Sequence, residues 1–222
     1  MKKVELCIFD MDGLLLDTEK QMWSISQVKA AREQGYDRDP KFFAAVMGGG
    51  VENATRILKQ LLDGPIDTDL YWSRVAYYNQ QFIDSNKKFL MPGVMELLTF
   101  LKENGIEMAV ATSTEAKVTI PLLKRHEIYD FFSYIKTGDT VKIGKPNPEI
   151  YLDVFNHYNY PKENIFIFED SHNGAQAAVS SGMNLILVPD FALVTDQDRK
   201  DAFRVLDKII QMIDVVKELN NK

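Results

Sequence analysis

Hydrophobic residues along this 222-residue chain form short continuous runs, separated by segments with helical spacing. The runs predict five strands, at residues 4–9, 107–112, 134–136, 165–168 and 185–188. Most of them lack the polar alternate positions of a half-solvated strand, which is typical of a parallel sheet covered on both faces. Helices are predicted between and after them, at residues 92–104, 115–126, 148–158, 171–181 and 207–219. This alternation predicts an α/β fold with a doubly wound, Rossmann-like parallel sheet.

One segment breaks the alternation. Residues 18–90 contain helical patterns and no strand pattern, so they predict four helices, at residues 18–34, 40–47, 52–62 and 68–86. Glycine-containing turns separate these helices. We interpret the segment as a helical module inserted after the first strand, which leaves residues 1–17 and 91–222 as a Rossmann-like core. A proline at position 121 predicts a kink or a later start in the helix at 115–126.

Composition narrows the classes of protein that fit this pattern. The content of 45% hydrophobic and 26% charged residues is that of a folded protein, and no apolar stretch approaches the about 18 residues of a membrane span. A net charge of −6 without a basic run argues against nucleic acid as a partner. The single cysteine, Cys7, excludes a disulfide framework and favours a reducing compartment. We therefore expect a cytoplasmic protein that binds neither membrane nor nucleic acid. We also expect a monomer, although the sequence leaves the oligomeric state open.

Acidic pairs follow two of the predicted strands. Asp10 and Asp12 end the first strand, and Glu169 and Asp170 end the fourth. Open α/β sheets bind ligands at the carboxyl ends of their strands, and a hard cation such as Mg²⁺ would offset the repulsion between such carboxylates. The alternatives are a solvated Asp-Gly turn at residues 12–13 and helix-capping acids at the fourth strand.

Hydroxyl groups and one lysine complete the candidate chemistry. Thr112 and Ser113 end the second strand just before a helix, an arrangement that can bind an anion or serve as an ordinary N-cap. Lys145 lies in a loop fixed by two prolines, where it could neutralise a phosphate, position a carboxylate nucleophile or simply be solvated. Taken together, these features suggest that one carboxylate attacks phosphorus while a second acts as acid and base.

Four motifs resemble those of the haloacid dehalogenase-like hydrolase superfamily. They are Asp10-x-Asp12-Gly-x-x-x-Asp17-Thr18-Glu19, then Thr112, then Lys145-Pro-Asn-Pro, and finally Glu169-Asp170-Ser-x-x-Gly174. Their order and spacing are similar to the subgroup that includes β-phosphoglucomutase and small sugar-phosphate phosphatases, over residues 4 to about 190. The resemblance implies that residues 18–90 are an α-helical cap domain on a catalytic core.

The resemblance also implies a role for each matching residue. Asp10 would be the nucleophile and a metal ligand, and Asp12 the acid/base with its backbone carbonyl on Mg²⁺. Lys145 would steady the nucleophile and the phosphate. The remaining roles would be Mg²⁺ binding by Asp170 and Glu169, phosphoryl binding by Thr112 and Ser113, and substrate or phosphate contacts by Thr18 and Asn147.

Two departures from the mutase branch bear on the reaction. No histidine occurs at residues 19–23, and no arginine occurs in the glycine-rich turn at residues 48–53. We therefore expect a Mg²⁺-dependent phosphatase of a small phosphorylated metabolite, such as a sugar phosphate. The alternatives are a hexose-phosphate mutase and a non-catalytic phosphate-ligand binding protein. A dehalogenase is disfavoured, because Asp12 and the paired acids at 169–170 make sense with a metal. The sequence leaves the substrate and the role of His172 open.

The negative charge is unevenly distributed along the chain. Residues 18–90 hold ten basic and nine acidic residues, whereas the remainder carries a net charge of −7. The acidity therefore belongs to the predicted core, where it would bind a cation, and the near-neutral helical module leaves room for an anionic substrate.

Overall fold

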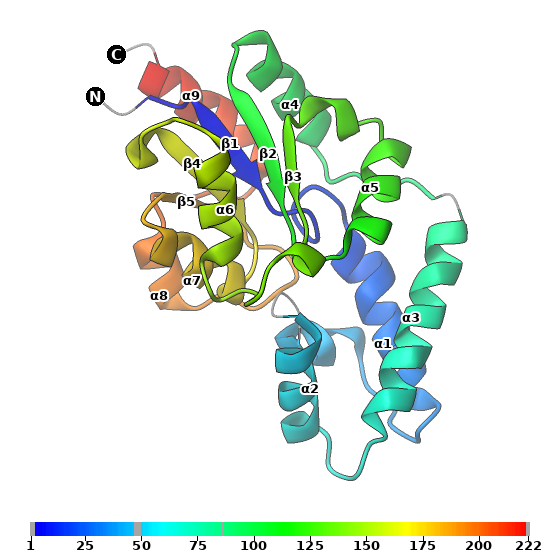
Figure 1. The fold of residues 1–222 in the computed structure, drawn as a ribbon. Helices are drawn as coiled ribbons and strands as arrows, with labels where there is room; N and C mark the ends of the chain where they lie inside the picture. The colour runs from blue at the N-terminus through cyan, green and yellow to red at the C-terminus, as the bar shows by residue number, and fades with distance from the viewer. Residues whose placement is uncertain (1–2, 47–49, 86, 221–222) are drawn as a thin grey trace.

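A six-stranded parallel sheet forms the centre of the computed structural model, which describes residues 3–46, 50–85 and 87–220 (Figure 1). Its strands are β1 (Leu6–Phe9), β2 (Glu107–Ala111), β3 (Tyr134–Lys136), β4 (Ile165–Glu169), β5 (Asn184–Leu187) and β6 (Arg204–Val205). They lie in the order β3-β2-β1-β4-β5-β6, and every neighbouring pair is parallel. The predicted α/β, doubly wound fold is confirmed, with the change of winding direction at β1.

Both faces of the sheet are covered, which explains the continuous hydrophobic runs of the sequence. Cys7 and Phe9 of β1 pack on one face with α4 (Val94–Glu103), α5 (Ala116–Arg125) and α9 (Met212–Asn220). Leu6 and Ile8 pack on the other face with α6 (Glu149–His157) and α7 (His172–Ser181). Successive strand residues thus serve opposite layers, and all four side chains of β1 are fully buried.

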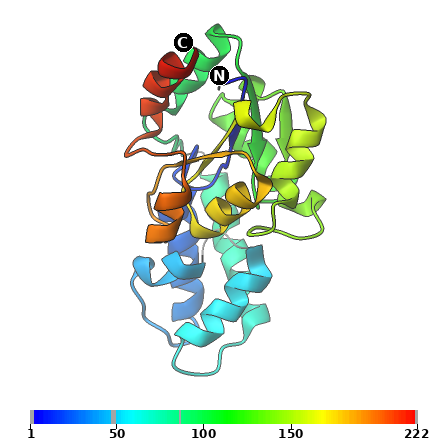
Figure 2. The same ribbon diagram turned by 90° about the vertical axis from the view of Figure 1, so that its left-hand side faces the viewer.

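The segment between β1 and β2 folds as helices with a core of their own. A π-helix at Glu19–Trp23 leads into α1 (Ser24–Arg32), and a 3₁₀-helix at Pro40–Val46 precedes α2 (Gly50–Leu61) and α3 (Thr68–Asp84). We call these elements the helical unit. Their shared hydrophobic cluster includes Ala30, Phe43, Leu58, Tyr71 and Val75. Figure 2 shows the helical unit stacked below the sheet along the length of the molecule.

The two chain segments that join the helical unit to the sheet run side by side. An isolated antiparallel bridge pairs Leu16 with Leu90, and the backbone N–H of Met91 donates to the carbonyl of Leu15. A further contact comes from the loop after β5, where Asp190 accepts from the Lys20 ammonium at 2.5 Å. The helical unit is therefore held over the carboxyl ends of the strands, while the predicted domain limits at residues 17/18 and 90/91 stay a prediction.

Prediction missed the strand β6, the helix α8 (Asp196–Asp201) and three short 3₁₀-helices at Tyr129–Phe131, Gly138–Thr140 and Lys162–Asn164, and other elements differ in type. The strand β6 has only two residues, both exposed, and α8 is entirely polar, so neither carries a hydrophobic pattern. The segment predicted as a helix at 40–47 is a 3₁₀-helix, and α5 continues through Pro121. The predicted helix ends at residues 47 and 86 lie outside the described residues.

The lone cysteine lies in the central strand. Cys7 is fully buried, and burial raises the pKa of its thiol far above the usual range. It is a core residue, as the sequence indicated. In the described part of the chain, no helix has both the length and the apolar character needed to cross a membrane.

Candidate active site

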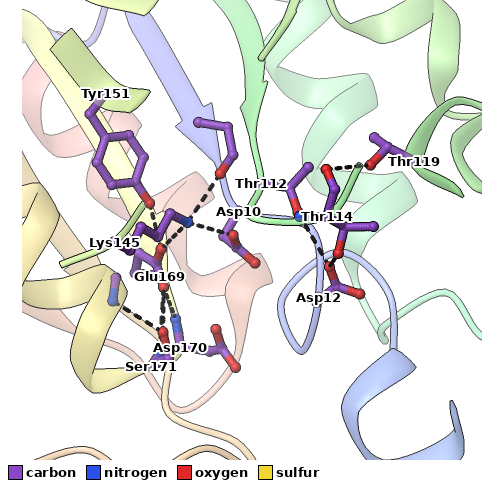
Figure 3. A network of polar contacts seen from close by, with 12 residues as sticks. Asp10, Asp12, Thr112, Thr114, Thr119, Lys145, Tyr151, Glu169, Asp170 and Ser171 are labelled. Carbon is purple, nitrogen blue, oxygen red and sulfur yellow. Dashed lines mark hydrogen bonds and ion pairs between the residues drawn. The ribbon is translucent and has the colours of Figure 1, made fainter. Parts of the chain in front are cut away.

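The carboxyl ends of β1, β2 and β4 meet around a buried lysine (Figure 3). The ammonium of Lys145 donates to Asp10 Oδ1 and to Glu169 Oε1, both at 2.6 Å, and to the carbonyl of Ala111 at 3.1 Å. All three charged side chains are almost entirely buried. Asp10 and Lys145 are 135 positions apart in the sequence, and the fold brings them into direct contact at the ends of the parallel strands.

Glu169 is held on every side by the protein. Its Oε1 also accepts from the hydroxyl of Tyr151, and its Oε2 accepts from the backbone N–H of Asp170 and the hydroxyl of Ser171, both at 3.2 Å. With both oxygens engaged by the protein, Glu169 anchors Lys145.

Asp12 receives four side-chain hydrogen bonds. The hydroxyl of Thr18 at 2.6 Å and the indole N–H of Trp23 at 3.2 Å donate to Oδ1. The hydroxyls of Thr114 at 2.6 Å and Thr112 at 3.3 Å donate to Oδ2. The carboxylate of Asp12 therefore accepts hydrogen bonds both from the helical unit with the segment that leads into it and from the residues at the end of β2.

A cavity of about 470 Å³ separates these strand ends from the helical unit. Of the residues predicted from sequence, Asp10, Asp12, Ser113, Lys145 and Asp170 line it. The opposite wall comes mainly from the helical unit. A phosphate ester entering this space would meet the acidic cluster and Lys145 at one end and helices at the other.

Four predicted residues lie behind the cavity wall rather than on it. Thr112 and Thr18 are fully buried, and their hydroxyls bind Asp12. The side-chain oxygen of Asn147 accepts the backbone N–H of Glu149 at 3.0 Å, which caps the start of α6. Glu169 binds Lys145, as described above. The structure therefore shows contacts within the protein for these four side chains, whereas Ser113 and Thr114 are hydroxyl residues that line the cavity, and the hydroxyl of Thr114 donates to Asp12.

The acidic end of the cavity holds more carboxylate than its lysine can balance. Burial and the neighbouring carboxylates of Glu169 and Asp12 raise the pKa of Asp10 to about 8, although Lys145 acts to lower it. Burial and neighbouring acids also hold the pKa values of Glu19 and Asp170 well above their usual range. By contrast, the carboxylates of Asp10 and Glu169 raise the pKa of Lys145 despite its burial.

The same acids leave oxygens without partners. Asp170 Oδ2 and Glu19 Oε2 are buried and accept no hydrogen bond. Such oxygens are costly unless a cation or a donor approaches them, and carboxylates are the ligands that Mg²⁺ prefers. Within the described residues, no three His, Cys, Asp or Glu side chains are gathered as a ready-made metal site. The donor chemistry therefore fits Mg²⁺, with main-chain oxygen or water needed to complete its coordination.

Sequence reasoning missed four residues of this site: Glu19, Trp23, Thr114 and Tyr151. Glu19 belongs to the first motif and is only 3% exposed. Its burial was not predicted, because the segment that contains it was interpreted as an ordinary helix start. Tyr151 occupies a buried position of α6, where its hydroxyl reaches Glu169. A buried tyrosine normally finds a partner for its hydroxyl, and that was the available signal.

A glycine of α7 is required by the position of Glu169. A Cβ atom at Gly174 would lie 2.0 Å from the Glu169 carboxylate. We expect Gly174→Ala to destabilise the protein by about 2 kcal/mol, although alanine normally favours a helix, because the Glu169 side chain would have to move. Urea unfolding measures the effect. Gly144→Ala is the matched control, since nothing lies within 4 Å of its Cβ position. Equal stability of the two variants would contradict the prediction.

Comparison with known proteins agrees with this architecture. A phosphorylated carbohydrates phosphatase of Thermotoga maritima is 34% identical over 183 residues, covering 82% of this chain and 84% of its own. The crystal structure of β-phosphoglucomutase from Clostridium difficile superposes with a TM-score of 0.78 at 25% identity, over 98% of this chain and 97% of that one. The crystal structure of CbbY from Rhodobacter sphaeroides in complex with phosphate superposes with a TM-score of 0.76 at 26% identity, over 94% of this chain and 96% of that one. Residues 7–188 match the haloacid dehalogenase-like hydrolase family, and the chain therefore belongs to that family.

Proposed function

We propose that the protein is a Mg²⁺-dependent phosphatase that hydrolyses a small phosphorylated metabolite, a sugar phosphate in particular, through an aspartyl-phosphate. It is a phosphatase of phosphorylated small molecules, as its family and its phosphatase relative indicate. The observation that carries the finer proposal is the contact of Lys145 with Asp10 Oδ1 at the cavity wall. This contact fixes Asp10 and leaves its Oδ2 as the oxygen for attack.

The proposed reaction has two displacements at phosphorus. Asp10 Oδ2 forms a bond to phosphorus as the ester P–O bond breaks, and Asp12, which begins this step protonated, gives its proton to the departing alcohol oxygen. Asp12 then takes a proton from a water molecule, whose oxygen attacks phosphorus and releases inorganic phosphate from Asp10. The hydrogen bonds to Asp12 hold it in place for both proton transfers, and the helical unit limits the entry of other water.

Mg²⁺ would be held by Asp10 and Asp170, together with the backbone carbonyl of Asp12. Glu19 is a further acid whose free Oε2 lies at the same end of the cavity, whereas both oxygens of Glu169 are engaged by the protein. When bound, the ion would balance charge on the phosphoryl oxygens. The unpaired oxygen of Asp170 supports this assignment.

The first test is phosphate release from a panel of phosphorylated metabolites, with Mg²⁺ and with EDTA. We expect release of inorganic phosphate, a loss of at least about 100-fold with EDTA, and recovery on adding excess Mg²⁺, because charge balance at phosphorus is lost without the ion. Incubation of β-glucose 1-phosphate with a bisphosphate primer separates the mutase alternative, since isomerised product without phosphate release would indicate a mutase. Inactivity on the whole panel with Mg²⁺ would contradict the proposal and favour a binding protein.

A further inference from the structure

The wall of the cavity that faces away from the acidic end carries no charge. Apart from Glu19 at the acidic end, every described side chain of the helical unit that lines the cavity is uncharged. A second phosphate or a carboxylate on the substrate would therefore find no cation on this wall, and burying it there would be unfavourable.

One cation does lie at the rim of the cavity, and it is already paired. Lys117 of α5 lines the cavity beside Glu115, and their side chains form an ion pair at 2.7 Å. The side chain of Lys117 is 79% exposed, so its charge is both neutralised by Glu115 and screened by solvent. This pair adds no net charge with which to recognise a second anionic group.

A buried amide belongs to the neutral wall. Asn79 lies on the inner face of α3, one turn beyond Val75, and is only 6% exposed. Its Oδ1 is buried without a hydrogen-bond partner, and the residue lines the cavity. A buried amide oxygen without a partner is costly, and a ligand that donates a hydrogen bond would remove that cost.

The two tryptophans of the chain lie on the same wall. The indole N–H of Trp23 is engaged by Asp12 at 3.2 Å, and that of Trp72 by the hydroxyl of Thr55 at 2.7 Å. With their polar atoms occupied, both side chains offer the cavity apolar ring surface. Such surface packs well against another ring, whether aromatic or the C–H face of a sugar.

We propose that this wall selects phosphate monoesters whose alcohol is uncharged, carries a ring and donates a hydrogen bond to Asn79 Oδ1. The ring packs against Trp23 and Trp72, and esters with a carboxylate or a second phosphate on the alcohol are rejected. The inference rests on the proposed function, because it takes the acidic end as the place where the phosphoryl group binds. It makes Asn79 a specificity-determining residue.

Binding measurements test the selection independently of catalysis. Because both tryptophans line the cavity, intrinsic tryptophan fluorescence reports ligand binding, and an Asp10→Asn variant with Mg²⁺ can be titrated without turnover. We expect glucose 6-phosphate and uridine 5′-monophosphate to bind at least about tenfold more tightly than 2-phosphoglycolate and fructose 1,6-bisphosphate. Equal or tighter binding of the charged esters would overturn the inference. Absence of hydrolysis by the wild type, with this order of binding intact, would overturn only the proposed function.

Substitution of Asn79 tests the hydrogen bond. Asn79→Leu should lower kcat/KM for glucose 6-phosphate about tenfold, mainly through KM, and change kcat/KM for phenyl phosphate less than about twofold, because phenyl phosphate has a ring but no donor. Gln81→Leu is the matched control, an exposed amide of the same helix that does not line the cavity. Equal losses on both esters would contradict the assigned hydrogen bond.

Adding a cation to the uncharged wall tests whether its lack of charge controls selection. Ala76 lines the cavity from α3, and Trp72 and Gln80, one turn away on either side, carry no acid that would pair with a new cation. Ala76→Lys should raise the preference for 2-phosphoglycolate over glucose 6-phosphate, taken as the ratio of kcat/KM values, at least about tenfold. An unchanged ratio would show that charge on this wall does not control selection.

Discussion

Replacing Asp10 with asparagine is expected to lower kcat for phosphate release by at least about 10⁴-fold, since an amide oxygen is a far weaker nucleophile than a carboxylate. The side chain keeps its size, and Lys145 retains its second carboxylate partner at 2.6 Å, so the fold should persist. Initial rates under saturating Mg²⁺ measure the loss. An acid-stable phosphorylated protein, trapped by quenching the wild type during turnover, should be absent from the variant.

The control for this substitution is Asp63→Asn. Asp63 lies between α2 and α3 with its side chain 92% exposed, and its ion pair with Arg38 spans 3.4 Å. We expect wild-type rates from this variant, because exposed ion pairs contribute little. Wild-type turnover by Asp10→Asn under the same conditions would exclude the aspartyl-phosphate mechanism.

Lys145→Met is expected to cost both activity and stability. It leaves Asp10 and Glu169 buried without the cation that contacts both of them, and breaking such a buried ion pair typically costs about 3–5 kcal/mol. Activity should fall at least about 10³-fold, because Asp10 loses the group that fixes it. Urea unfolding and initial rates measure the two effects.

The pH dependence of this variant has a definite sign. Lys145 lowers the pKa of Asp10, which burial otherwise raises, so its removal raises that pKa further. In the folded variant the Asp10 carboxyl group then keeps its proton at pH values where the same group in the unfolded chain has lost it. The free energy of unfolding of the variant therefore falls as the pH rises. We expect the destabilisation relative to wild type to be greater at pH 9 than at pH 6.

Lys142→Met is the matched control, an exposed lysine of the same loop. It should change the free energy of unfolding by less than about 0.5 kcal/mol at either pH. Destabilisation by Lys145→Met that is no larger than that of Lys142→Met would contradict the view that Lys145 is the counterion of the buried acids.

The sheet and the convergence of the strand ends could be predicted because both depend on local patterns. Hydrophobic runs fixed the five longer strands to within two residues, and parallel order alone brings Asp10, Lys145 and Asp170 to one edge. Elements without an apolar pattern were missed: β6 consists of two exposed residues, and α8 carries only a capping box between Thr195 and Asp198 as a signal.

The partners of individual polar side chains could not be predicted, because they depend on tertiary distances. Thr112 and Thr18 were expected to contact the phosphoryl group or the substrate, which stays a prediction, and in the structure both hydroxyls donate to Asp12. Nothing in the sequence indicated these bonds to Asp12. The contact of Asn147 was open to prediction from the sequence. An asparagine just before a helix is a local helix-start signal, and here its side-chain oxygen accepts the backbone N–H of Glu149.

The burial of Cys7 in β1 has a practical consequence for experiments on this molecule. It is the only cysteine of the chain, and reagents for thiols cannot reach it while the sheet is intact. A cysteine introduced on α2 or α3 can therefore be labelled selectively in the native protein, without first removing the natural thiol. Conversely, the rate at which Cys7 itself reacts would report the exposure of the central strand without a denaturant, and it equals the opening rate where labelling is faster than reclosing.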